Sequence, residues 1–125
     1  MSKEDLVVLA VDDDMINRKL IKSMLVKTDD VSEVIEAANG MDALDILKKD
    51  PSIDIVLLDI IMPIIGGIDF LKVAGADDVL KGLPIIVLTT DETIRAEALN
   101  EGANDFLTKP IREKDIVSKM AKLIL

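Results

Sequence analysis

The sequence contains no cysteine, histidine, tryptophan or tyrosine in its 125 residues. The first two absences exclude disulfides, cysteine nucleophiles, zinc sites of the Cys/His kind and histidine base chemistry. Long apolar runs are also missing, because runs such as residues 55–58 are the size of a strand and not of a membrane span. The first residues are charged and do not resemble a signal peptide. A cytoplasmic protein is therefore expected.

The charge balance is strongly acidic, with a formal net charge of −9. This balance makes DNA and anionic membranes poor direct partners. The length suits one domain that buries a core without disulfides or a structural metal. Because no linker or low-complexity tract is visible, a single domain over residues 1–125 is expected.

Strand-like apolar runs alternate five times with segments of helical apolar spacing. The expected strands are 6–11, 34–37, 53–58, 85–88 and 106–108, and the expected helices are 15–27, 41–49, 68–80, 92–101 and 113–125. Gly75 weakens the regularity of the third helix. The pattern predicts an α/β fold in which helical crossovers join parallel strands and cover both faces of the sheet.

Polar side chains follow four of these five strands. Asp12 and Asp13 follow the first strand, Asp59 the third, Thr89 the fourth and Lys109 the fifth. Ligands of open parallel sheets bind beyond the carboxyl ends of the strands, so these side chains are expected to meet in one site.

Each residue alone has a simpler explanation. Asp14, just before the first helix, is expected to be a helix N-cap. Thr89 suits the end of a strand as a β-branched residue, and Lys109 suits an exposed loop. Together, however, three converging carboxylates would raise one another's pKa values, and a divalent cation relieves that repulsion. Oxygen ligands favour Mg²⁺, with Mn²⁺ as a possible substitute.

In order along the chain, the motifs resemble those of the response regulator receiver domains of two-component systems, including chemotaxis regulators. The matching segments are residues 11–13, 57–63 with Gly67, 88–90, 102–107 and 109–110. The resemblance covers essentially the whole chain. It implies a flavodoxin-like, doubly wound (βα)5 fold with the parallel strand order 2-1-3-4-5.

The resemblance also implies roles for the acidic residues. Asp59 corresponds to the aspartate that accepts a phosphoryl group. Asp13 corresponds to a direct Mg²⁺ ligand, with Asp12 as its partner, and Asp59 and the backbone carbonyl of Ile61 complete the protein ligands.

Further roles fall on the fourth and fifth strands. Thr89 and Lys109 correspond to the residues that contact the phosphoryl group, and Pro110 to a proline that follows a cis peptide bond. Phe106 occupies the position of an aromatic switch residue, although a plain core role is equally compatible with it.

The partners follow from the same resemblance. Since the chain has no histidine, the phosphoryl donor is expected to be a sensor histidine kinase or a histidine phosphotransfer protein. The face built by residues 92–101, 106–108 and 113–125 is expected to change conformation and to contact an effector or a second copy of the chain. The protein is expected to be a phospho-acceptor with slow autodephosphorylation, not a turnover enzyme.

Two departures from the common pattern carry hypotheses. An apolar patch beside the site is expected to dock the helical donor, and its residues are Met15, Ile16, Ile64 and Ile65. Ile61 and Asp91, two residues beyond Asp59 and Thr89, correspond to positions that tune hydrolysis. An isoleucine cannot orient an attacking water, so a long-lived phosphoryl group is expected.

Three alternatives belong to other classes. A phosphohydrolase would carry a second aspartate two residues after the first, where Ile61 stands. A flavin carrier shares the architecture but needs aromatic residues to flank the flavin, and tryptophan and tyrosine are absent. A receiver-like domain that is never phosphorylated is disfavoured by the full set of acidic, threonine and lysine residues.

Overall fold

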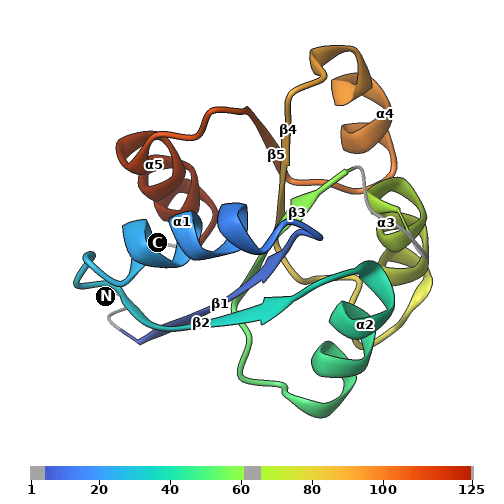
Figure 1. The fold of residues 1–125 in the computed structure, drawn as a ribbon. Coiled ribbons are helices and arrows are strands. Elements are labelled where there is room, and N and C mark those ends of the chain that lie inside the picture. The colour runs from blue at the N-terminus through green and yellow to red at the C-terminus, as the bar shows by residue number, and fades with distance from the viewer. Residues whose placement is uncertain (1–4, 61–65, 125) are drawn as a thin grey trace.

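The computed structural model describes residues 5–60 and 66–124. Its centre is a parallel five-stranded sheet in the order β2-β1-β3-β4-β5 (Figure 1), which agrees with the order expected from the resemblance. The strands are β1 (Leu6–Val11), β2 (Val31–Ala37), β3 (Ile55–Asp59), β4 (Ile85–Thr89) and β5 (Asp105–Thr108).

Helices cover both faces of the sheet (Figure 1). They are α1 (Met15–Leu25), α2 (Gly40–Lys49), α3 (Gly67–Ala76), α4 (Arg95–Asn100) and α5 (Glu113–Ile124), with a short 3-10 turn, η1 (Glu92–Ile94), before α4. Helices α1 and α5 lie on one face, and α2, α3 and α4 lie on the other.

The core has two layers, one on each side of the sheet. Every residue of β3 and β4 is buried, as expected for central strands of a sheet covered on both faces. Phe70 of α3 and Leu9 of β1 belong to one layer, and Ile21 of α1 and Ile116 of α5 to the other. Apolar burial on both faces therefore leaves the ends of the strands as the place for polar chemistry.

The third helix is shorter than the sequence predicted. It ends at Ala76, and the Asp77 side chain then accepts the backbone N–H of Val79 at 2.8 Å. Aspartate competes for backbone donors in this way and favours turns over helix interiors. The prediction of a helix over 68–80 was wrong in its last turn for this reason.

Other boundaries moved by a few residues. β2 begins at Val31 and not at residue 34. It is an edge strand in which Ser32 and Glu33 are polar and exposed, so apolar patterning does not mark its start. The predicted helix 92–101 divides into η1 and α4, since the first turn is a tight 3-10 turn capped by Asp91. Among the described residues, no helix has both the length and the apolar character needed to span a membrane.

Candidate functional site

The strand register brings the acidic residues to one edge of the sheet. Val11 of β1 pairs with Leu58 of β3, so the next residues, Asp12 and Asp59, leave the two neighbouring strands at the same level. Asp13 follows at the rim. One carboxylate oxygen from each of the three lies within 4.8 Å of the others. The three aspartates predicted from the sequence therefore form one cluster.

Burial differs within this cluster. Asp12 is 2% exposed and Asp59 is 8% exposed, whereas Asp13 is exposed to solvent. Aspartate is rarely buried to this extent unless it is paired or binds a metal. The site thus has two carboxylates inside the molecule and one at its entrance.

Lys109 lies between the two buried carboxylates. Its Nζ is 3.1 Å from Asp12 Oδ2 and 3.2 Å from Asp59 Oδ1. Its backbone N–H donates to the carbonyl of Thr89 at 2.8 Å, and its peptide bond to Pro110 is cis. The hydrogen bond to Thr89 joins the end of β5 to the end of β4, and Lys109 lies there beside the acidic pair.

The electrostatics of the site follow from this arrangement. Burial, reinforced by the charge of Asp12, raises the pKa of Asp59, although Lys109 opposes the effect. For Lys109, burial disfavours the charged ammonium, but the hydrogen bonds and charges of Asp12 and Asp59 outweigh it and raise the pKa. The ionised Asp59 is therefore under-compensated, which is the condition that a divalent cation would relieve.

Thr89 is buried beside this cluster, with 1% of its surface exposed. Its Oγ1 accepts the backbone N–H of Asp91 at 3.2 Å. The Asp91 carboxylate points away, because it caps η1 by accepting from Thr93, and this hydrogen bonding lowers the pKa of Asp91. Thr89 thus uses its oxygen as an acceptor toward Asp91, and a threonine hydroxyl can donate at the same time.

Phe106 is buried against the sheet at 6% exposure, inside the core layer under α2, α3 and α4. The guanidinium carbon of Arg95, at the start of α4, lies 5.9 Å from the centre of its ring, within the range of a cation–π contact. The core role considered from the sequence is therefore real, and Arg95 links it to the segment that follows Thr89.

Two of the four predicted patch residues are described. Met15 and Ile16, at the start of α1, are 59% and 68% exposed. Ile64 and Ile65, and also Ile61 with its carbonyl, lie outside the described residues. Next to this end of α1, a groove of about 420 Å³ runs between the helix and the segment after β5, and its lining includes Leu20, Met24 and Ile111.

Gly67 fixes the backbone that follows Asp59. Its N–H donates to the carbonyl of Ile60 at 2.8 Å, and an added Cβ would lie 2.7 Å from the Ile60 Cα and 2.8 Å from the Asp59 carbonyl oxygen. Only glycine fits such a close approach. Gly67 belongs to the motif recognised in the sequence, but the sequence alone did not show why a glycine is needed there.

Sequence reasoning missed one pair of charged residues at the site. Arg18 of α1 and Glu36 of β2 form an ion pair of 3.1 Å, and Arg18 also donates to the backbone carbonyl of Asp12. The available signal was the position of Arg18, six residues after Asp12 on a helix that begins at the same sheet edge.

Comparisons with known proteins agree with this geometry. The family model for the response regulator receiver domain matches residues 8–121. The two-component response regulator ORR7 of Oryza sativa subsp. japonica is 34% identical over 87% of this chain, which spans only about half, 52%, of that relative.

Solved structures give the same match. The chemotaxis protein CheY4 of Vibrio cholerae has a TM-score of 0.85 and 30% identity, with 96% of this chain and 98% of that chain covered. The receiver domain of the Francisella response regulator 1452 has a TM-score of 0.85 and 25% identity, with 96% and 97% covered.

Proposed function

The chain belongs to the response regulator receiver domain family, and from this premise we propose that it is a switch that accepts a phosphoryl group on Asp59. One observation supports this most directly. Asp12, Asp13 and Asp59 share one cluster at the sheet edge, and Lys109 Nζ contacts the two buried members. The arrangement supplies a nucleophile, a cation site and a phosphate-binding cation in one place.

The donor set fits Mg²⁺, because all the candidate ligands are oxygens and the cluster is short of positive charge. The residues that would hold the ion are Asp12, Asp13 and Asp59, together with the backbone carbonyl of Ile61, whose place remains a prediction. When bound, the ion would neutralise charge on the phosphoryl oxygens. Mn²⁺ would serve the same ligands.

The transfer itself asks little covalent work of the protein. A carboxylate oxygen of Asp59 forms a bond to the phosphorus while the phosphorus–nitrogen bond of a donor phosphohistidine breaks, and the imidazole of the donor takes up a proton. Lys109 orients Asp59 before transfer and holds a phosphoryl oxygen afterwards. The donor is a sensor histidine kinase or a histidine phosphotransfer protein, which meets the receiver in the cytoplasm.

The readout is a change on the face formed by α4, β5 and α5. The hydroxyl proton of Thr89 is the directional donor for a phosphoryl oxygen, and its movement would carry Asp91 and η1 with it, since Asp91 N–H is bonded to Thr89 Oγ1. Arg95 and Phe106 then change their packing. An effector, or a second copy of the chain, reads this change as a shift between two populated states.

Intact-mass measurement after incubation with acetyl phosphate and Mg²⁺ tests the proposal. We expect a gain of one phosphoryl group, which is lost in Asp59→Asn and in metal-free buffer. Asp45→Asn, a change of an exposed residue in α2, is the matched control and should be phosphorylated normally. A phosphorylated Asp59→Asn protein would refute the assignment.

A further inference from the structure

We propose that Arg18 is a positioning residue for the acidic site. Its guanidinium holds the peptide group between Asp12 and Asp13 in the orientation from which both carboxylates reach one divalent cation. The inference rests on the proposed function, because it concerns the metal site of that function. It adds a residue outside the set of aspartates, threonine and lysine.

The contacts of Arg18 span two strands. Its Nη1 donates to the Asp12 carbonyl at 2.6 Å, and its Nε donates to Glu36 Oε1 at 3.1 Å. The Arg18 side chain is only 13% exposed. It therefore makes two simultaneous hydrogen bonds of fixed geometry, which is what the planar fork of a guanidinium provides.

The local fold explains how Arg18 reaches this place. Asp14 caps α1 by accepting the backbone N–H of Ile16, and the Arg18 N–H donates to the Asp14 carbonyl one turn later. The first turn of the helix therefore points the Arg18 side chain back toward the end of β1, as helical side chains lean toward the N-terminus.

The bonded atom matters because a peptide group is planar. A hydrogen bond to the Asp12 carbonyl fixes the plane of the peptide group between Asp12 and Asp13. The two Cα atoms that flank this plane carry the Asp12 and Asp13 side chains. Asp12 is also held by its N–H, which donates to Ala37 at 3.1 Å, and by Oδ1, which accepts from Asp14 at 2.9 Å. For the exposed Asp13, the orientation of this plane sets the direction in which its side chain leaves the backbone.

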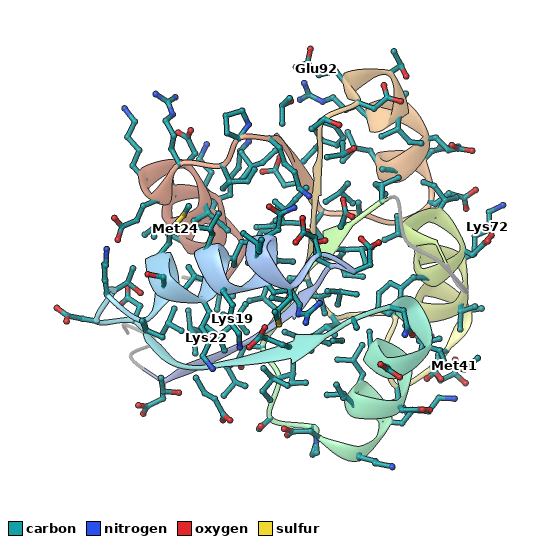
Figure 2. All side chains as sticks on the ribbon, in the orientation of Figure 1. Lys19, Lys22, Met24, Met41, Lys72 and Glu92 are labelled. Atoms are coloured by element: carbon teal, nitrogen blue, oxygen red, sulfur yellow. The ribbon has the colours of Figure 1, made fainter. Side chains whose placement is uncertain are left out.

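The chain offers a matched control for charge. Lys19 lies on the same helix and also pairs with Glu36, at 2.7 Å, but it is 58% exposed and its bond goes to the other oxygen of Glu36 and not to Asp12. Figure 2 shows Lys19 and Lys22 extending from α1 toward β2. Replacing Lys19 thus removes one positive charge from the ion pairs of Glu36 and leaves the hydrogen bond to the Asp12 carbonyl in place.

The sign of the effect separates positioning from simple electrostatics. Removing a positive charge near a site for a dication reduces repulsion and strengthens binding of the ion. Loss of positioning weakens it instead, and residues that orient metal ligands typically change affinity 10- to 100-fold, so roughly tenfold is expected for a contact through the backbone.

The experiment is a titration of the metal-free protein with MgCl₂ at constant ionic strength. Calorimetry and the chemical shifts of the amides in NMR spectra measure the binding of the ion. We expect Arg18→Met to bind Mg²⁺ about tenfold more weakly than the wild type, and Lys19→Met to bind it equally or slightly more tightly. Arg18→Lys keeps the charge but loses the fork, so it should also bind more weakly. Because this variant is the milder change, it provides the result if Arg18→Met does not fold.

Several results would overturn the inference. Unchanged or tighter Mg²⁺ binding by folded Arg18→Met or Arg18→Lys, even with a reduced free energy of unfolding, would leave Arg18 a purely structural role. Equal weakening in the Arg18 and Lys19 variants would assign the effect to Glu36 and not to the Asp12 carbonyl. A wild-type protein that binds no Mg²⁺ would remove the metal site of the proposed function as well, so the two failures are distinguishable.

Discussion

The ionised carboxylate of Asp59 destabilises the folded protein. It is buried, and this burial, reinforced by the charge of Asp12, raises its pKa despite the neighbouring Lys109. A raised pKa in the folded state means that the ionised form destabilises the fold, and this destabilisation disappears as the pH falls through the raised pKa toward the ordinary value. The residue that carries the proposed function thus lowers the stability of the metal-free protein at neutral pH.

Asp59→Asn should therefore stabilise the metal-free protein. At neutral pH we expect a gain on the order of 1 kcal/mol, the low end of what relieving unfavourable buried charge gives. The gain should shrink as the pH falls through the raised pKa of Asp59. Urea unfolding at several pH values measures it, with Asp45→Asn as the control that should show no such trend. A gain that does not depend on pH would contradict this electrostatic explanation.

Ile61, two residues after Asp59, is the subject of a prediction about the lifetime of the phosphoryl group. An isoleucine offers no hydrogen bond to orient a water for attack on the phosphoryl group, so Ile61→Asn should shorten the lifetime of the phosphorylated protein several-fold. Loss of the phosphoryl group with time, followed by intact mass, measures this. An unchanged decay rate would show that Ile61 does not limit hydrolysis.

The sequence predicted which residues lie together at the candidate site, but it did not predict all the hydrogen bonds that they make. Asp12, Asp13, Asp59 and Lys109 were found because parallel strands deliver their carboxyl ends to one edge. The hydrogen bond from the Asp91 N–H to Thr89 Oγ1 was not predictable, since it depends on the turn that follows β4. The bonds of Arg18 were missed because no sequence pattern states which backbone carbonyl a helical side chain will reach.

Among the elements, the start of α3 approaches the end of β3 closely. Gly67 opens α3 directly against Ile60 and the Asp59 carbonyl. A side chain there would force the end of β3 to shift, and Asp59 with it. The start of α3 therefore controls the position of Asp59.

Gly67→Ala should destabilise the protein by roughly 1–3 kcal/mol, the usual cost of overpacking, and should slow phosphorylation by acetyl phosphate. Gly75→Ala is the matched control in the same helix, because its added Cβ would have 3.9 Å to its nearest neighbour, Glu101. There we expect a small gain, about 0.5 kcal/mol, from better helix propensity. Urea unfolding compares the two, and equal effects would disprove the role assigned to the close approach.

The elements themselves were largely predictable where burial is uniform. β1 and β4 came close to their observed bounds, because both are continuous apolar runs. β2, α3 and the start of α4 were misplaced, and in each case polar side chains decide the boundary: Ser32 and Glu33 at the exposed edge of the sheet, Asp77 in a turn, and Asp91 as a cap. Apolar periodicity does not record such local hydrogen bonds.

At the scale of the whole molecule, the exposed start of α1 follows shortly after Asp13 in the chain, and Lys109 of the acidic site also lines the adjacent groove. Met15 and Ile16 are large apolar side chains that face solvent, and we expect a protein donor to approach from this side. The acidic surface alone would not hold such a donor, so an apolar contact is expected to contribute.

Charged substitutions at the start of α1, such as Met15→Glu with Ile16→Lys, should slow phosphotransfer from a protein donor at least tenfold, since interface anchors often contribute more than 1 kcal/mol. Phosphorylation by acetyl phosphate should be unaffected, because a small donor needs no docking surface. Val79→Glu, which replaces an exposed apolar residue after α3, is the control. Equal slowing with both donors would mean that the substitutions damage the site itself.

The bridging position of Lys109 means that the site is never without a cation. A metal ion held by Asp12 and Asp59 would not fill a bare anionic pocket but would compete with the Lys109 ammonium for their carboxylate oxygens. Lys109→Met should accordingly bind Mg²⁺ more tightly, by several-fold, and yet accept phosphoryl groups more slowly, and calorimetry with acetyl phosphate kinetics would separate the two effects. Loading would then be an exchange of counter-ions, because the chain carries its own competitor for these oxygens, and Lys109 would again contact both buried carboxylates whenever the ion leaves.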